Sequence, residues 1–480
     1  MNTNGPPAPT PSNGSEQTVL LYAPAKKLYP RAVSGTFNTW RWILVAITQL
    51  LFYGLPWLTW DNRPAVLLNL VERKFYIFGL VLWPQDFIYL TALLVLSAFS
   101  LFLFTAVAGR LFCGYACPQT VYTEIFMQIE RWIEGDRAER MRRDTKGPAG
   151  ERTIRRLIKY VAWLVVALWT GYTFAGYFTP IRELGGLIVT SDLGPWQTFW
   201  ILFYSGFTIL QAGFMREQVC KYMCPYARFQ SVMFDRDTLI VTYDEDRGEL
   251  RGSRSKKIAH SELRASGKGD CIDCGVCVDV CPTGIDIRMG LQYECIGCGA
   301  CVDGCDTIMD KMNYPRGLIR YSTQNAVANH YTAAQLRRHI LRPRVLIYTG
   351  ILSAITLLVF GTLLTREPLK LDIMRDRGAL AREVEGTAIE NTYQFQMINT
   401  DEHEHQVKVT VRGLPGLTIA SGDTLSVPAT STRLFVVRMQ APIAELEKIE
   451  KGAHKIQIRI QSLTSPDVDI EEKAAFFIPR

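Results

Sequence analysis

The chain reads Cys271-Ile-Asp-Cys274-Gly-Val-Cys277-Val-Asp-Val-Cys281-Pro282, and a little later Cys295-Ile-Gly-Cys298-Gly-Ala-Cys301-Val-Asp-Gly-Cys305. Each run has the spacing C-x2-C-x2-C-x3-C, which is typical of proteins that bind 4Fe–4S clusters. Iron in such clusters prefers soft thiolate ligands, and three closely spaced cysteines can reach three irons of one cluster. The two runs therefore predict a module with two 4Fe–4S clusters.

The fourth cysteine of each run is expected to serve the other cluster, as in ferredoxins that hold two clusters. One predicted ligand set is Cys271, Cys274, Cys277 and Cys305. The other is Cys295, Cys298, Cys301 and Cys281. Asp306 replaces the usual proline after Cys305, which changes the turn and none of the ligands. Disulfides or two zinc sites are the alternatives, and the doubled spacing argues against both.

Length and composition indicate several units and a membrane. The chain has 480 residues, which is too long for one compact domain, and 48% of them are hydrophobic. Its formal net charge is +7, and the basic residues flank apolar runs, so we expect a membrane partner and no nucleic acid. All twelve cysteines lie between Cys113 and Cys305, so the remaining tail carries no disulfide framework.

Five apolar runs are long enough to cross a bilayer as helices. They are residues 42–60, 87–108, 160–178, 199–215 and 345–364. Several have Trp or Tyr at their ends, as residues at a membrane interface do. Another apolar stretch, 65–83, is interrupted by Glu72-Arg73-Lys74, and three charges at mid-depth would be costly. We interpret it as a hairpin or re-entrant piece outside the membrane core.

The basic residues predict the orientation of these spans. The connection between the second and third spans is rich in arginine, whereas the next connection offers only Arg182. We therefore place the N-terminus and residues 216–344 in the cytoplasm and the tail after the fifth span in the periplasm. Every cysteine then lies on the reducing side. We interpret residues 128–156 as a basic interfacial helix and linker in contact with anionic lipid.

The pattern divides the chain into five parts. We expect a tail at 1–41 with a disordered start, a four-span membrane domain at 42–225, a dicluster ferredoxin module at 226–343, a fifth span at 344–365 and a β-sandwich at 366–480. In the last part the hydrophobic period changes to two, as in Val407-Lys-Val-Thr-Val411, with Gly or Pro turns between the runs. A short amphipathic helix is expected over 332–342.

The predicted fold is therefore a multi-pass α-helical membrane protein with five spans. It carries an inserted cytoplasmic ferredoxin module of α+β structure and a C-terminal all-β domain, whose number of strands favours an immunoglobulin-like sandwich.

Two further cysteine pairs have the pattern C-x3-C-P. Cys113-Gly-Tyr-Ala-Cys117-Pro118 follows the second span, and Cys220-Lys-Tyr-Met-Cys224-Pro225 follows the fourth. The similarity continues beyond each pair, so the first four spans look like two copies of one hairpin. Positions i and i+4 share a helix face, so each pair can hold one soft metal ion. Proline should place the second thiol near the end of its helix.

Two such pairs at the same membrane depth predict one site with four thiols. Its candidate occupants are Cu(I), a third iron–sulfur cluster or zinc, and the alternative is ordinary packing of four buried cysteines. Met215 and Met223 are nearby thioethers that would suit Cu(I), although packing is the better interpretation for them. We interpret His403 and His405 as part of a solvated turn rather than as metal ligands.

The order of these features closely resembles the FixG/RdxA/CcoG family of bacterial cytochrome c oxidase accessory proteins. The resemblance covers nearly the whole chain and includes Tyr29-Pro-Arg-Ala-Val-Ser-Gly35, Cys224-Pro-Tyr-Ala-Arg-Phe-Gln230 and Thr238-Leu-Ile-Val-Thr-Tyr-Asp244. It implies a cupric reductase of the bacterial inner membrane that supplies Cu(I) for assembly of a cbb-type oxidase. Assembly factors of that oxidase or copper chaperones would be its partners. The residues alone predict clusters and a thiolate site; copper comes from the resemblance.

Three hypotheses from different classes fit this sequence. The first is a metalloreductase, in which an unknown cytoplasmic or quinol donor supplies electrons that reach Cu(II) through the two clusters. Its catalytic and copper-binding residues would be Cys113, Cys117, Cys220 and Cys224. The second is an electron-transfer subunit that serves a partner protein, with the four thiols holding an additional cluster or serving structure. The third is an assembly scaffold that docks through its outer β-domain. We favour the first.

Overall fold

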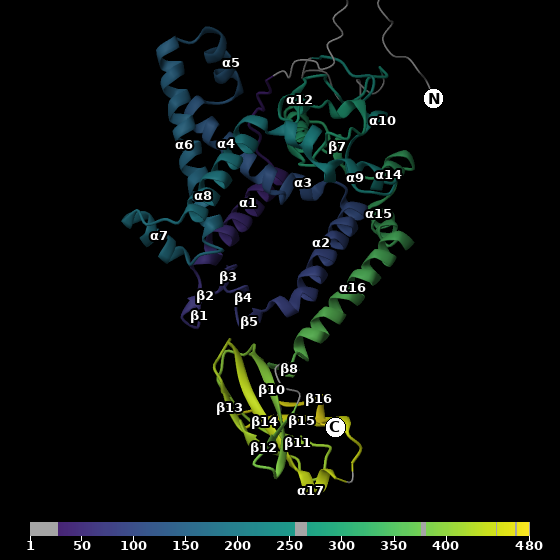
Figure 1. Ribbon diagram of the computed structural model, residues 1–480. Helices are drawn as coiled ribbons and strands as arrows, with labels where there is room; N and C mark the ends of the chain where they lie inside the picture. Colours follow the sequence, from purple (N-terminus) through teal and green to yellow (C-terminus); the bar gives the residue numbers. More distant parts are fainter. Residues whose placement is uncertain (1–26, 255–265, 376–380, 448, 466–467, 480) are drawn as a thin grey trace, which may run out of the picture.

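The computed structural model describes residues 27–254, 266–375, 381–447, 449–465 and 468–479. The chain is arranged in three parts along one long axis (Figure 1). Helices occupy the middle, the cysteine-rich module lies at one end, and the β-domain lies at the other. The predicted disordered start lies outside the described residues.

Within the described residues, four helices are long and apolar enough to cross a membrane. They are Pro84–Ala108, which contains α2 (Phe87–Ala108); α6 (Ala149–Ala175); Pro195–Met215, formed by α8 (Pro195–Thr208) and η3 (Ile209–Met215); and α16 (Pro343–Leu364). These helices correspond to four of the five predicted spans and indicate a membrane protein. A shorter helix, α7 (Ile181–Thr190), lies between α6 and α8.

The first predicted span differs from the prediction. Helix α1 covers Thr36–Gly54, begins before residue 42 and is not among the four long apolar helices. Residues 55–60 form the 3-10 turn η1 (Leu55–Trp57) and the short strand β1 (Thr59–Trp60), which pairs with β2 (Arg63–Pro64). Pro56 explains this early end, because it has no N–H to continue the α-helical hydrogen bonds.

The expected pair of equivalent hairpins is not formed by whole helices. Helix α2 packs along α16, whereas α6 packs against α8. Helix α1 instead lies against α3 (Leu111–Tyr115), α6 and α13 (Ala300–Met312) (Figure 1). The carboxylate of Asp303 in α13 accepts hydrogen bonds from the backbone N–H groups of Phe37 and Asn38, at 3.2 and 2.7 Å. The cysteine-rich module thereby caps the N-terminus of α1.

The charged hairpin is confirmed. Strands β3 (Val66–Asn69), β4 (Lys74–Ile77) and β5 (Leu80–Leu82) form an antiparallel sheet with Glu72 and Arg73 in the first turn. This sheet lies beside the β-domain, and Lys74 Nζ donates to Thr430 O at 3.0 Å. The short helix η2 (Pro84–Asp86) ends in Asp86, which is buried and pairs with Lys370 at 2.7 Å. These contacts fix the β-domain to the helices.

The basic segment 128–156 is not one helix followed by a linker. It consists of the end of α4 (Pro118–Glu134), helix α5 (Arg137–Lys146) and the start of α6. Arg140 is 4% exposed and pairs with Glu130 at 2.9 Å. Glu130 also lies 3.5 Å from Lys159 and 3.0 Å from Arg216. Acidic partners on α4 therefore pair part of the positive charge within the protein, and the contact with anionic lipid stays a prediction.

The cysteine-rich module keeps the internal repeat in its backbone. Gly275 and Gly299 have φ of 69° and 72°, and each precedes a helix, α12 (Val276–Asp279) and α13. Glycine adopts positive φ more readily than other residues, so each half of the repeat begins its helix from the same left-handed backbone conformation. The remaining elements are α9 (Pro225–Met233), β6 (Ile240–Tyr243) paired with β7 (Ile319–Ser322), α10 (Glu245–Gly248), η5 (Ile287–Met289), α14 (Gln324–Ala328) and α15 (Ala333–Ile340). The expected short helix before the last span is therefore confirmed as α15.

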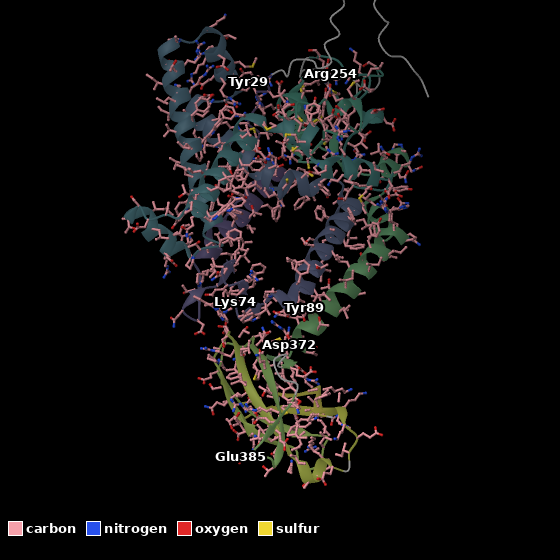
Figure 2. The ribbon with its side chains drawn as sticks, viewed as in Figure 1. Tyr29, Lys74, Tyr89, Arg254, Asp372 and Glu385 are labelled. Carbon is pink, nitrogen blue, oxygen red and sulfur yellow. The ribbon has the colours of Figure 1, made fainter. Side chains whose placement is uncertain are left out.

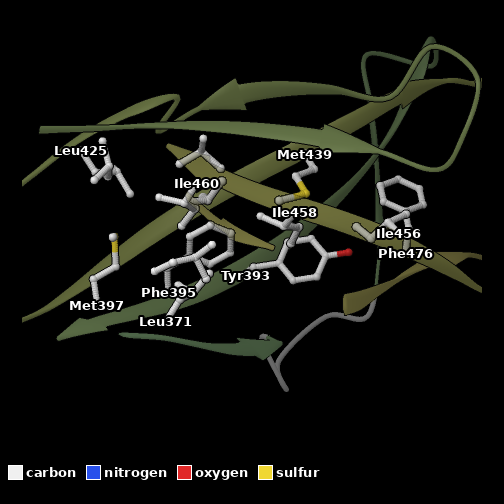
Figure 3. Close-up of a cluster of buried hydrophobic side chains, with 14 of the residues drawn as sticks. Leu371, Tyr393, Phe395, Met397, Leu425, Met439, Ile456, Ile458, Ile460 and Phe476 are labelled. Atoms are coloured by element: carbon white, nitrogen blue, oxygen red, sulfur yellow. The ribbon is translucent and has the colours of Figure 1, made fainter. Parts of the chain in front are cut away.

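The β-domain is a sandwich of two antiparallel sheets, as predicted. One sheet contains β8 (Leu369–Arg375), β9 (Arg382–Val384), β10 (Ala388–Asn399), β12 (Thr418–Ser421) and β14 (Thr432–Pro442). The other contains β11 (His405–Arg412), β13 (Thr424–Val427), β15 (Gly452–Ser462) and β16 (Asp469–Ile478), and α17 (Ile443–Leu446) follows β14. Alternate residues such as Phe395, Met439 and Ile458 fill the core (Figure 3).

His405 does not belong to a solvated turn. It is the first residue of β11 and is only 1% exposed. Its Nε2 atom lies 3.1 Å from Asp401 and its Nδ1 atom 3.2 Å from Ser462 Oγ. The alternation of the strand turns this side chain inward, so our interpretation of it was wrong.

Candidate functional site

Four cysteines drawn from both runs line a first cavity of about 350 Å³. They are Cys271, Cys274, Cys277 and Cys305. Cys305 reaches this cavity from α13, although it belongs to the second run. The structure thus brings together the side chains that we predicted as one ligand set.

The other four cysteines of the module line a second cavity of about 340 Å³. They are Cys281, Cys295, Cys298 and Cys301. Cys277 also lines this second cavity, so the two cavities are adjacent. Sulfur atoms gather where the helices meet the module (Figure 2).

Both cavities fit an iron–sulfur group chemically. Among the described residues that line them, neither cavity has a carboxylate or an imidazole, so sulfur is the main donor. Burial raises the pKa of Cys295 to about 12 and that of Cys305 to about 12. Such thiols stay protonated at neutral pH unless a cationic centre stabilises the thiolates. Iron would supply that positive charge.

The C-x3-C-P pairs sit at breaks between helices. Cys113 lies in α3 and Cys117 immediately precedes α4, whose first residue is Pro118. Cys220 lies in the π-helical turn η4 (Val219–Met223), and Cys224 precedes α9. Proline therefore starts a new helix, and the two thiols of a pair do not share one continuous helix face. That part of the prediction was wrong, because the backbone turns before the second cysteine.

The two pairs nevertheless lie near one another, since Cys117, Cys220 and Cys224 all act electrostatically on Cys113, and we call these four cysteines the four-thiol site. The pKa of Cys113 is raised to about 12, mainly by burial and next by the neighbouring thiol of Cys117. Cys220 and Cys224 raise it by smaller amounts. Burial likewise raises the pKa of Cys220 to about 12. Met223 is exposed and Met215 half-buried, so packing remains the simpler interpretation for the thioethers.

Gln230 is a neighbour of this site that our sequence reasoning missed. Its side chain is fully buried, and its amide oxygen lies 3.4 Å from Cys113 Sγ. Its amide nitrogen lies 3.4 Å from Thr105 Oγ1, and Thr105 contacts the Tyr226 hydroxyl at 2.6 Å. The available signal was the place of Gln230 at the end of the motif that begins with Cys224.

Across the part of the chain that the structure describes, no three His, Cys, Asp or Glu side chains are arranged to hold one metal ion. Among the described residues, neither the two cavities nor the four-thiol site has such an arrangement. A single Cu(I) or zinc ion at the four-thiol site would require its thiols to move closer together.

The four-thiol site lies directly against the second cavity. Cys113 and Cys220 pack with Ile296 and Cys298 in one buried cluster. A Cβ atom added to Gly114 would stand 2.8 Å from the carbonyl oxygen of Ile296. The three cysteine groups therefore follow one another in the order first cavity, second cavity, four-thiol site.

Two tyrosines reinforce this contact. The hydroxyl of Tyr115, inside the first C-x3-C-P motif, lies 3.1 Å from that of Tyr321. Tyr321 in turn donates to the carbonyl oxygen of Gly297 at 2.6 Å, within the second cysteine run. The hydroxyl pair therefore links the four-thiol site to the loop that lines the second cavity.

A small cavity borders Cys220. Thr283 and Ile296 from the module form one side of it, and Glu124, Arg41 and Glu217 are among its polar lining residues. Arg41 and Glu124 form a buried ion pair at 2.6 Å. The cavity provides polar surroundings next to one of the four thiols.

Three family models match this chain. The model described as "4Fe-4S dicluster domain" matches residues 215–324. The model described as "4Fe-4S binding domain" matches residues 90–135, which include Cys113 and Cys117. A third, described as an IG-like fold at the C-terminal of FixG, matches residues 359–479.

Curated relatives are similar over most of the chain. Protein RdxB of Cereibacter sphaeroides is 37% identical, with 90% of this chain and 94% of the relative covered. Protein RdxA of the same organism is 36% identical, with 93% and 96% covered. Nitrogen fixation protein FixG of Rhizobium meliloti is 36% identical, with 89% of each chain covered. A solved FixG-related protein from Vibrio parahaemolyticus is 21% identical over 24% of this chain and 98% of its own, with a TM-score of 0.21.

Proposed function

The chain belongs to the family of FixG, RdxA and RdxB, and on that premise we propose that it is a membrane iron–sulfur oxidoreductase that reduces Cu(II) to Cu(I). The observation that carries this proposal is the direct backbone contact between the second cysteine run and the four-thiol site. That contact supports a continuous route for electrons from the module to the membrane surface.

The module's eight cysteines would hold two 4Fe–4S clusters in the two sets described above. Bound clusters of this kind supply one-electron transfer. Cys277 lines both cavities and so keeps the two sets adjacent. The lining of the first cavity is largely apolar and includes Leu318 and Ile319.

The four-thiol site is where we place the acceptor. Each Cu(II) takes up one electron and becomes Cu(I), and no covalent bond to the substrate needs to form or break. Thiolates bind Cu(I) in preference to Cu(II), so Cys113, Cys117, Cys220 and Cys224 favour the reduced product. The electrons come from a reduced cytoplasmic carrier or a quinol.

The arrangement of the three parts supports a transmembrane role. The module and the β-domain lie at opposite ends of α2 and α16 (Figure 1). We place the N-terminus and module in the cytoplasm and the β-domain in the periplasm of a bacterium whose inner membrane the helices cross. The product, Cu(I), would serve assembly of a cbb-type oxidase through assembly factors or copper chaperones.

A second function is favoured by one specific observation, because the family model that matches residues 90–135 is described as a 4Fe–4S binding domain. A third cluster at the four-thiol site would make the protein an electron-transfer subunit whose acceptor is a partner protein.

Anaerobic purification of the full chain tests both functions. We expect iron and sulfide for two clusters, an EPR signal after reduction, and reduction of added Cu(II) measured with a Cu(I)-specific chelator. Cys224→Ser should abolish copper reduction and leave the EPR signals of the two module clusters unchanged. Met223→Leu, a change to an exposed neighbour, is the matched control and should retain activity.

The outcomes separate the two functions. Unchanged copper reduction in Cys224→Ser would refute the assignment of the acceptor site. Iron and sulfide beyond two clusters in the wild type, lost in Cys224→Ser, would establish the second function if the wild type also binds no copper.

A further inference from the structure

Arg110 occupies a buried position between the four-thiol site and the second cavity. It lies just before α3, and only 5% of its surface is exposed. Its guanidinium donates to the backbone carbonyls of Tyr293 and Ala227. Tyr293 leads into the second cysteine run, and Ala227 lies in α9, just after Cys224. The side chain thus bridges the two sites through hydrogen bonds.

The charge of Arg110 has no carboxylate partner among the described residues. Its Nε atom is buried there without a hydrogen-bond partner. Two equally buried arginines contrast with it, since Arg41 pairs with Glu124 at 2.6 Å and Arg140 with Glu130 at 2.9 Å. A buried charge without a counter-charge is strongly unfavourable, so another anion must balance Arg110.

Thiols are among the groups close to Arg110 that can carry negative charge. Its Nη1 atom lies 3.4 Å from the carbonyl oxygen of Cys295, whose thiol lines the second cavity. Arg110 also immediately precedes α3, which carries Cys113, and it donates to Ala227, three residues after Cys224. The guanidinium therefore lies between the second cavity and the four-thiol site.

We propose that Arg110 is the counter-charge shared by the second cluster and the metal centre of the four-thiol site, and that it sets the reduction potentials of both. This inference rests on the proposed binding of clusters and holds whichever metal occupies the four-thiol site. Reduction adds negative charge to a centre, so a fixed cation nearby favours the reduced form and raises the potential. Arg110 is thus a positioning residue on the electron route.

Two variants of the full chain, purified without air, test the role of this charge. Arg110→Gln keeps N–H donors for the carbonyls and removes the charge, whereas Arg110→Lys keeps the charge. EPR-monitored redox titration measures the potential of each cluster, and metal analysis measures loading. In Arg110→Gln we expect reduction of the second cluster to become at least about tenfold less favourable, or ~59 mV for one electron. The four-thiol site should also retain less metal.

The first cluster provides an internal control, because the hydrogen bonds of Arg110 go to Tyr293, Cys295 and Ala227, none of which lines the first cavity. Its potential should stay unchanged in both variants, and Arg110→Lys should keep both potentials close to wild type. An unchanged second potential in Arg110→Gln, or an equal fall in both variants, would overturn the inference. If Arg110→Gln yields no metal-loaded protein, Arg110→Lys provides the test. Retention of the wild-type potential and metal content supports the inference, and their loss overturns it. Wild-type protein without iron and sulfide would instead refute the proposed function.

Discussion

Gly114 lies so close to Cys298 that a Cβ atom on Gly114 would stand 2.8 Å from the Cα atom of Cys298. Real Cβ atoms essentially never approach a backbone atom so closely. Gly114 is part of the first C-x3-C-P motif, and Cys298 belongs to the second run of the module. The absence of a side chain at position 114 is therefore what allows the two cysteine groups to touch.

Gly114→Ala should separate these groups. The added methyl meets backbone atoms that cannot rotate away, so we expect a loss of about 1–3 kcal/mol of stability from overpacking. Transfer of electrons into the four-thiol site should also slow. Thermal unfolding in detergent and stopped-flow reduction of Cu(II) measure the two effects. Gly206→Ala in α8, where nothing lies within 4 Å of the added atom, is the control. Equal behaviour of the two variants would contradict this prediction.

The spectra of cysteine variants should group by the cavity that each side chain lines and not by the run to which it belongs. Cys271→Ser and Cys305→Ser should remove the same EPR signal, because both side chains line the first cavity. Cys281→Ser should instead match Cys295→Ser, since those two line the second cavity. EPR spectra of the four reduced variants decide the point. A shared spectrum for Cys305→Ser and Cys295→Ser would show that each run holds its own cluster.

Glu130 should be important for stability, because one carboxylate serves Arg140, Lys159 and Arg216. Burial raises the pKa of Glu130, but Arg216, Arg140 and Lys159 together outweigh it and hold the pKa below its usual value. The stabilisation is therefore present above the ordinary carboxyl pKa and is lost as pH falls through the lower folded value.

Glu130→Gln should cost about 3–5 kcal/mol, because it leaves buried cations without their counter-charge. The loss should appear as a lower Tm at neutral pH. Glu139→Gln in α5 removes only an exposed pair with Arg143 and should cost less than about 1 kcal/mol. If both variants unfold at the same temperature, the network on α4 contributes little.

Asp144 should hold the segment that precedes α1. Its carboxylate contacts Lys27 at 2.7 Å, Tyr29 at 2.6 Å and Arg156 at 2.7 Å. Burial raises the pKa of Asp144, but these hydrogen bonds outweigh it and hold the pKa well below its usual range. The attachment should therefore persist through mildly acidic pH and fail only when pH falls through that low value.

Asp144→Asn should release this segment at neutral pH, so trypsin should cut after Lys27 and Arg31 faster than in the wild type. Asp310→Asn, which affects an exposed pair with Arg316, should not change that rate. Unaltered cleavage in Asp144→Asn would show that other contacts, such as Arg31 N–H to Asp279 O at 2.8 Å, are sufficient.

Local patterns allowed much of this structure to be predicted. The spacing of the eight module cysteines predicts cluster binding from residues that are close in the sequence. The alternating pattern of β11 and β15 predicts strands in the same way. The features that we missed depend on partners far apart in the sequence. Arg110 belongs to the arginine-rich connection after the second predicted span, and its contacts with Tyr293 and Ala227 join residues that are more than a hundred positions away in the sequence. Likewise, no local signal pairs α2 with α16.

The cap that Asp303 places on α1 has a consequence for biogenesis. Helix α1 leaves the ribosome long before residue 303 is made, so its first N–H groups have no protein acceptor from Asp303 until the module has folded. Asp303 stands between Cys301 and Cys305, so its position depends on the same turn that gathers the thiols. In a nascent chain that lacks iron or sulfide, the first helix would therefore be loosely anchored. Membrane quality-control proteases recognise defects of this kind.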